Sequence, residues 1–184
     1  SLPEASQKNS PSLSTNYFSA TFASFVGLLT LPCHGLVDTG AQDGVIGLWH
    51  FSRWCALFAT RYQLRPHFVP VPSNCEAGGI GGSARPLGIA DMPMGLAGVS
   101  GICRFVILED PSPEQRTPPL LPISLLKDID AVLEPKYSLL TLRDAGVVTQ
   151  LTDVEESKHQ TMNMMGFGEE GWVCPDFETD PLIR

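Results

Sequence analysis

Apolar residues along this chain occur mostly in short runs that glycine and proline interrupt, which is the pattern of strands joined by turns. Residues 17–40 mix aromatic and β-branched residues with such breaks and predict a strand, a turn and a second strand. Residues 67–110 hold many glycines between short apolar runs and predict β-hairpins, with the strongest strand at 103–110. Residues 137–151 predict another hairpin, with a polar tip at 143–146.

Two segments show the three- and four-residue steps of a helix instead. The first spans residues 48–64 and is expected to end at Pro66. Its predicted apolar face consists of Leu48, Phe51, Cys55, Phe58 and Tyr62. The second lies within residues 120–135, where an apolar strand end turns into a short amphipathic helix that is expected to stop at Pro135. The pattern as a whole predicts an all-β, β-rich fold with one clear helix and a second short one.

The ends of the chain differ in composition from its middle. Residues 1–17 are rich in Ser, Pro, Asn and Gln, and we expect a flexible arm because such residues cannot offset the entropy of ordering. Beyond Glu155 the apolar pattern fades. We therefore predict one folded domain over residues 18–152, followed by a tail of unknown order over residues 153–184.

The charge and cysteine content narrow the function classes. The formal net charge is −8 and the 12 Lys and Arg residues are scattered, so we expect no nucleic-acid partner. The longest apolar runs fall short of the roughly 20 residues that cross a bilayer, so no membrane partner is expected either. The N-terminal residues lack the basic start and apolar core of a secretory signal. Five widely spaced cysteines favour free thiols and an intracellular, cytoplasmic location.

The candidate chemistry lies where the apolar pair Leu36–Val37 runs into Asp38, Thr39 and Gly40. Burying an isolated carboxylate costs several kcal/mol unless it is paired or protonated. The triplet alone also fits an aspartate that caps a turn. Its context is more specific, because a glycine-rich stretch, GGIGG, follows at residues 78–82 and an apolar stretch, LLPISLL, follows at residues 120–126.

This order of motifs, over roughly residues 20–143, resembles the retropepsin-like aspartic proteases of retroviruses and retrotransposons. The resemblance implies an acid protease barrel with one lobe per chain, active as a two-fold homodimer. Peptide hydrolysis by aspartates needs two carboxylates that share one proton. Asp144, in the only near-repeat of the triplet, lacks the hydroxyl and is interpreted as a hairpin turn. The second carboxylate would therefore be Asp38 of a second copy of the chain.

The resemblance assigns roles to individual positions. Asp38 would be the catalytic residue, Thr39 would hydrogen-bond across the dimer, and Gly40 would let the backbone turn closely. The residues expected to line the substrate cleft are Ala41, Gln42 and Asp43. The residues expected to form the flap tip over a bound peptide are Gly78, Gly79, Ile80, Gly81 and Gly82. The implied partners are a second copy and an extended polypeptide, such as the chain's own polyprotein, and neither a metal nor a cofactor is implied.

The chain departs from the family pattern behind the catalytic turn. Pro122 and Ser124 stand where the family has Gly and an acid or amide, and Gln42 and Ile123 replace an acid and an arginine that usually pair. Two alternatives therefore stay open: a catalytically silent module that binds or dimerises, and an unrelated β-barrel in which the triplet is accidental. The His and Cys residues show neither metal-ligand spacing nor a Cys–His nucleophile pair.

Overall fold

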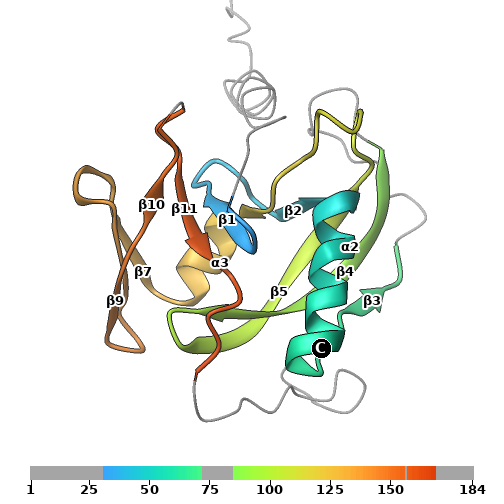
Figure 1. Cartoon of the computed structure of the whole chain (residues 1–184). Helices are drawn as coiled ribbons and strands as arrows, with labels where there is room; N and C mark the ends of the chain where they lie inside the picture. Colours follow the sequence, from blue (N-terminus) through green and yellow to red (C-terminus); the bar gives the residue numbers. More distant parts are fainter. Residues whose placement is uncertain (1–30, 72–84, 156, 169–184) are drawn as a thin grey trace, which may run out of the picture.

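The structure, a computed structural model, describes residues 31–71, 85–155 and 157–168. Within these ranges the chain forms an eight-stranded sheet and a three-stranded sheet, with two short α-helices (Figure 1). The predicted fold class, β-rich with one or two short helices, is confirmed. The active homodimer stays a prediction.

The large sheet is mixed, and its strands come from most of the described chain. In spatial order they are β10 (Thr152–Asp153), β11 (Gln160–Asn163), β1 (His34–Val37), β6 (Leu120–Leu121), β2 (Gly44–Gly47), β5 (Val99–Leu108), β4 (Pro86–Leu96) and β3 (His67–Val69). β6 lies between β1, to which it is parallel, and β2, to which it is antiparallel. The loop from β1 to β2, residues 38–43, therefore passes over the end of β6.

The small sheet consists of β7 (Ala131–Glu134), β8 (Leu139–Leu142) and β9 (Val147–Gln150), all antiparallel. The β8–β9 hairpin confirms the one predicted for residues 137–151, and Asp144 lies exposed in its turn. One prediction here is wrong. The second helix, α3 (Ile123–Asp128), does not continue to Pro135, because Asp130 adopts a left-handed conformation with φ of 47° and β7 follows. Pro135 instead begins a 3₁₀ turn, Pro135–Tyr137.

Helix α2 (Leu48–Leu57) continues into a π-helical turn, Phe58–Tyr62, and confirms the predicted long helix. The predicted packing face is confirmed at Phe51 and Phe58, which are buried, and at Cys55 and Tyr62, which pack against the core. Leu48 does not belong to this face, because it is 42% exposed, whereas Trp54 does, since it is buried with its ring edge-on to Phe105. The helix also ends before Pro66. Gln63 adopts a left-handed conformation with φ of 54°, and the N–H of Leu64 donates to the carbonyl of Phe58.

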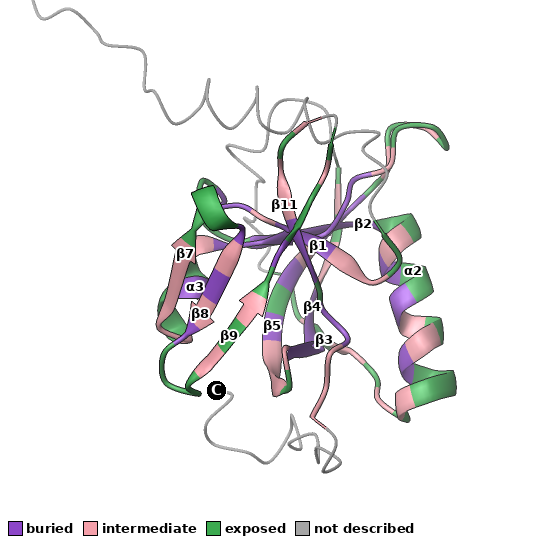
Figure 2. Ribbon diagram, turned by 60° about the vertical axis from the view of Figure 1, so that its left-hand side comes forward, coloured by how far each residue is buried: buried purple, intermediate pink, exposed green. Residues whose placement is uncertain are grey.

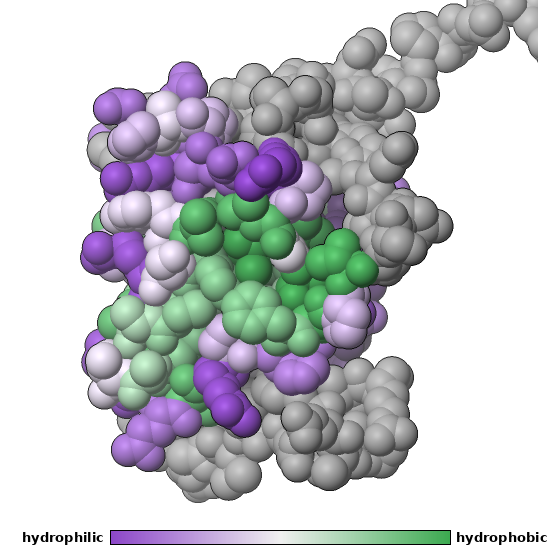
Figure 3. Space-filling model, turned by 90° about the vertical axis from the view of Figure 1, so that its right-hand side faces the viewer, coloured by the Kyte–Doolittle hydropathy of each residue, from purple (hydrophilic) through white to green (hydrophobic). Residues whose placement is uncertain are grey.

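The main core lies between the large sheet and the elements packed on it, with buried residues from α2, α3 and β8. Figure 2 shows buried residues along β2 and along much of β4, whereas α2 keeps an exposed side. The side of the molecule that carries α2 and β3 gathers apolar side chains at its surface (Figure 3). Leu48 of α2 and Phe68 of β3, which is 61% exposed, belong to these elements.

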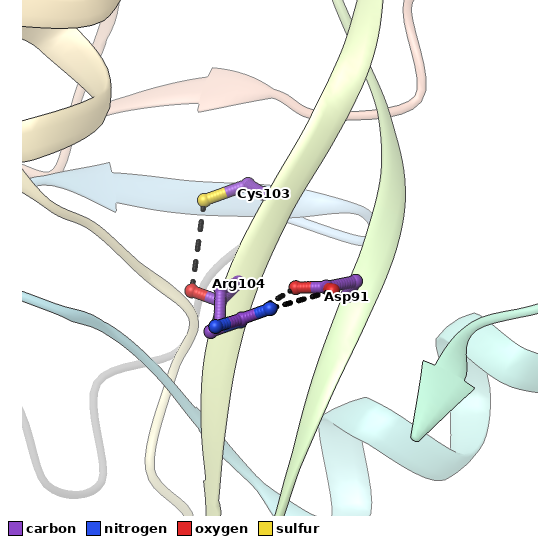
Figure 4. A network of polar contacts seen from close by, with 3 residues as sticks. All are labelled: Asp91, Cys103 and Arg104. Carbon is purple, nitrogen blue, oxygen red and sulfur yellow. Dashed lines mark hydrogen bonds and ion pairs between the residues drawn. The ribbon is translucent and has the colours of Figure 1, made fainter. Parts of the chain in front are cut away.

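The long β4–β5 hairpin confirms the hairpin expected within residues 67–110 and contains most of the predicted strand 103–110. Its turn, Ala97–Gly98, has positive φ at both positions, as a type I′ turn requires. Asp91 on β4 is buried and receives two hydrogen bonds, of 2.8 and 2.9 Å, from the guanidinium of Arg104 on β5 (Figure 4). This ion pair joins the two strands because Asp91 and Arg104 are register partners.

Residues that the sequence assigns to the tail take part in the large sheet. β11 pairs antiparallel with β1, and β10 pairs with β11. After β11, the chain crosses β4, where the N–H of Gly95 donates to Met164 and the N–H of Gly166 donates to Gly95. Across the three described ranges, none of the helices has the length and hydropathy that crossing a membrane would take.

Candidate functional site

Asp38 follows β1 directly and lies in the interior of the protein. Its N–H donates to the carbonyl of Leu121 on β6 at 3.1 Å, and the residue is 7% exposed. Carboxylate Oδ1 accepts a hydrogen bond of 2.9 Å from the N–H of Gly40. Oδ2 is buried and has no hydrogen-bond partner among the described residues. A buried carboxylate oxygen is normally satisfied, so this atom marks Asp38 as a candidate functional group.

The loop after Asp38 brings the other predicted residues next to it. The N–H of Ala41 donates to the carbonyl of Asp38 at 3.3 Å and closes a turn, and Ala41 is fully buried. Thr39, Gly40, Gln42 and Asp43 are exposed. The predicted flap residues, Gly78–Gly82, lie outside the described residues, so their placement over this loop stays a prediction.

Residues at the start of α3 hold the loop in place through two hydrogen bonds. The N–H of Ile123 donates to the carbonyl of Ala41 at 2.8 Å, and the hydroxyl of Ser124 donates to the carbonyl of Gln42 at 2.9 Å. Pro122 has φ of −80°, which the proline ring accommodates. The two departures from the family pattern, Pro122 and Ser124, are therefore compatible with a well-held loop.

A hollow of about 260 Å³ opens beside Thr39, on the side of the loop where α3 and β7 lie. Its lining combines apolar side chains with one positive and one negative residue. The lining residues are Thr39, Ile123, Leu126, Lys127, Asp130, Ala131 and Leu133. A mostly apolar hollow next to an exposed loop is suited to receiving a protein side chain.

His159 lies within electrostatic range of Asp38, and sequence reasoning did not assign it to the site. Burial lowers the pKa of its imidazole, while the charge of Asp38 acts in the opposite direction and raises it. His159 lies just before β11, and the pairing of β11 with β1 brings it near the loop. Because this pairing joins segments more than a hundred residues apart, no local spacing could have indicated it.

The cysteines described here do not form a second reactive centre. Burial raises the pKa of the Cys33 and Cys55 thiols, and it raises that of Cys103 to about 12, with the nearby carboxylates adding to the effect. A thiol with a raised pKa is a poor nucleophile at neutral pH. In the described part of the chain, no three His, Cys, Asp or Glu residues gather closely enough to hold a metal ion.

Comparison with solved structures shows a likeness in fold. No protein-family model and no curated protein matches the chain. The crystal structure of the retroviral protease-like domain of Ddi1 from Leishmania major is 23% identical in sequence, with a TM-score of 0.44. The match covers 62% of this chain and 79% of that chain. Neither catalysis nor assembly follows for this chain at that degree of similarity.

Proposed function

We propose that this chain is an aspartic endopeptidase of retropepsin type, which hydrolyses peptide bonds in extended polypeptides as a homodimer. The observation that carries the proposal is the buried carboxylate of Asp38. One of its oxygens is fixed by the N–H of Gly40, and the other has no partner among the described residues. A second carboxylate with a shared proton would satisfy that oxygen and would make the burial of both groups favourable.

The chemistry follows from two carboxylates that hold one proton. The ionised carboxyl takes a proton from a water molecule while the water oxygen attacks the peptide carbonyl carbon. The protonated carboxyl gives its proton to the carbonyl oxygen. When the tetrahedral intermediate collapses, the carbon–nitrogen bond breaks, the nitrogen leaves with the proton taken from water, and the other carboxyl recovers its own. The rate should therefore be bell-shaped in pH, with an acidic to mildly acidic optimum.

The loop around Asp38 is held well enough for such chemistry. Ala41 and Gln42 are each tethered through their carbonyls to α3, by Ile123 and Ser124. A catalytic group whose support is fixed before the substrate arrives loses less free energy in reaching the productive geometry. Gln42 and Asp43 remain exposed, and we assign them to substrate contact.

We assign the hollow beside Thr39 to the second copy. Thr39 is exposed next to the buried Asp38, so a two-fold axis that brings two Asp38 side chains together also brings the two Thr39 side chains together. The hollow continues this surface onto α3 and β7. The other occupant to consider is a substrate side chain, and the oligomeric state of the free protein distinguishes the two.

The test compares cleavage of an unfolded protein or peptide library at pH 4 to 7 by the natural chain and by Asp38→Asn. This substitution keeps the shape of the side chain and removes its charge. We expect cleavage by the natural chain and none by the variant. If neither cuts at high protein concentration while both are folded, the chain is a silent binding or dimerisation module. Equal cutting by both would place the activity elsewhere.

A further inference from the structure

The exposed side of α2 carries an indole ring between two guanidinium groups. Cζ of Arg116 lies 3.9 Å from the centre of the Trp49 ring, and Cζ of Arg53 lies 4.7 Å from it. Arg53 is one helical turn after Trp49 on α2, whereas Arg116 comes from the loop between β5 and β6. This stack of three side chains therefore joins two elements at the surface, where Trp49 is 36% exposed.

The carboxylate beside this stack is engaged by the backbone. One oxygen of Asp110 accepts a hydrogen bond of 2.9 Å from the N–H of Trp49, and the other accepts one of 2.8 Å from the N–H of Thr117. Asp110 thus fixes the backbone under the indole. Within the described ranges, neither Arg53 nor Arg116 forms an ion pair. The N–H groups of both guanidiniums are therefore available to carboxylates of another molecule.

Positive charge is concentrated on this side of the molecule, although the chain as a whole has a net charge of −8. Residues 48–71 form α2, the π-helical turn and β3. They include neither aspartate nor glutamate, and their three arginines are all exposed: Arg53, Arg61 and Arg65. The loop between β5 and β6 also carries acids, so the excess of positive charge lies on the helical segment. Such a surface attracts negatively charged groups locally.

Apolar side chains gather on the same side (Figure 3). Phe68 of β3, which is 61% exposed, lies edge-on to Phe51 of α2 with their ring centres 5.8 Å apart, so the two elements form one surface. The small side chains of Ser52 and Ala56 are exposed on α2, so a second backbone can approach the helix closely. We call this region the α2 surface, and its residues are Trp49, Ser52, Arg53, Ala56, Phe68 and Arg116. Exposed apolar patches mark sites of protein contact, where Trp and Arg are enriched among the residues that contribute most.

We propose that the α2 surface binds a short acidic segment of another protein, in which carboxylate and apolar side chains alternate. The partner's carboxylates accept hydrogen bonds from Arg53 and Arg116, and its apolar side chains pack on Trp49 and Phe68. A short segment meets only the local positive charge, whereas nucleic acid, with a charge on every nucleotide, also meets the net negative charge of the chain. The inference does not depend on the proposed proteolysis, because the α2 surface includes neither the loop 38–43 nor the hollow beside Thr39.

The first experiment measures binding of a labelled synthetic peptide, in which Asp and Glu alternate with Leu and Phe, to the full chain by fluorescence anisotropy. Arg53→Gln combined with Arg116→Gln should weaken binding about tenfold, because two exposed ion pairs are lost. Lys136→Gln is the matched control, since Lys136 also lies over an exposed ring, that of Tyr137 at 5.4 Å, and should bind like the natural chain. Equal binding by the double variant and the natural chain, with both folded, would overturn the inference.

The second experiment tests the apolar part of the α2 surface and its separation from the proposed substrate cleft. Phe68→Ser should weaken peptide binding several-fold, whereas Val148→Ser, on β9 and also 61% exposed, should not. Asp38→Asn should bind the peptide as the natural chain does. Binding that is lost in Asp38→Asn and kept in the double arginine variant would place the peptide in the cleft instead and would overturn the inference.

The same measurements distinguish the other occupants. Displacement of the peptide by single-stranded DNA at a lower concentration than by unlabelled peptide would indicate nucleic acid. A dimer that dissociates only in the double arginine variant would assign the α2 surface to a second copy. Peptide binding that appears only after the acids within residues 169–184 are replaced by amides would assign the surface to the chain's own acidic segment. Each of these three results would overturn the proposal.

Discussion

At the scale of single residues, the geometry of the candidate site depends on where the hydrogen bonds of one loop go. The loop is exposed at Thr39 and Gln42 but is anchored by the buried Ala41. Its carbonyls reach α3 through one backbone bond and one hydroxyl. The hydroxyl of Ser124 is the part of this support that a conservative substitution removes without disturbing the backbone.

Ser124→Ala should therefore loosen the loop. Loss of the 2.9 Å hydrogen bond from the Ser124 hydroxyl to the Gln42 carbonyl should lower the free energy of unfolding by about 0.5–1.5 kcal/mol. Peptide cleavage should fall several-fold in kcat with little change in KM. Ser52→Ala is the control, because the Ser52 hydroxyl bonds within α2 to the carbonyl of Leu48. If both variants cleave like the natural chain, the tether is not needed for catalysis.

His50 should make the fold sensitive to acid. The pKa of His50 is lowered from 6.5 to about 4, mainly by burial; the charge of Asp110 opposes this shift, and the charges of Arg116 and Arg53 add to it. The unfolded chain therefore binds a proton at His50 before the folded chain does. Stability due to this residue is complete above pH 6.5 and is lost as the pH falls toward 4.

The measurement is the urea midpoint at pH 7, 5.5 and 4.5. His50→Gln cannot take up this proton, so its midpoint should fall less between pH 7 and pH 4.5 than that of the natural chain. An equal fall in both proteins would mean that other groups account for the acid sensitivity.

At the scale of elements, periodicity predicted where helices and hairpins begin better than where they end. The hairpins containing β4–β5 and β8–β9 follow from local turn chemistry at Gly98 and Gly146, both with positive φ. The helix ends do not, because Gln63 after the π-helical turn and Asp130 after α3 adopt left-handed conformations at positions that the apolar periodicity does not mark.

The sheet order and the site's surroundings were less accessible from the sequence. Asp38 was identified because its motif is contiguous. β11 was not identified, since its partner β1 is distant in the chain and its four residues, Gln160–Asn163, are mostly polar or flexible in type. His159 was missed for the same reason. Long-range strand pairing determines the position of both β11 and His159, and a short polar strand gives no periodic signal in the sequence.

Residues 164–167 pack against β4, and a substitution of Gly95 tests how much this contact contributes to stability. A Cβ on Gly95 would lie 2.7 Å from Cα of Phe167 and would press on the backbone of Gly166. Gly95→Ala should therefore lower the free energy of unfolding by about 1–3 kcal/mol. Gly101→Ala, on β5 with open space around its Cβ, should change stability little. Equal unfolding free energies for the two variants would mean that residues 164–167 contribute little to stability.

At the scale of the whole molecule, two surfaces are candidates for self-association. The apolar side of Figure 3 carries α2 and β3, whereas β7, next to the hollow, lies on the opposite side of the molecule in Figure 1. We assign the second copy to the Thr39 side, because a two-fold axis there would bring two Asp38 carboxylates together.

Substitution of exposed threonines tests this assignment. Thr39→Arg places a long charged side chain at the proposed axis, and we expect it to shift the protein from dimer to monomer in sedimentation velocity. Thr60→Arg, at an exposed position on the far side near the end of α2, should leave the dimer intact. A dimer that persists in Thr39→Arg but dissociates in Thr60→Arg would move the interface to the α2 side.

The central claim is that one active centre takes Asp38 from two copies, and mixing the natural chain with Asp38→Asn tests it most directly. With subunits exchanging freely and the amount of natural chain held constant, an equal amount of the variant should reduce peptide cleavage to about half. Random pairing then leaves half of the natural chains in mixed dimers that contain a single carboxylate. Cleavage that stays constant as the variant is added, with subunit exchange verified, would show that each chain acts alone and would contradict the account.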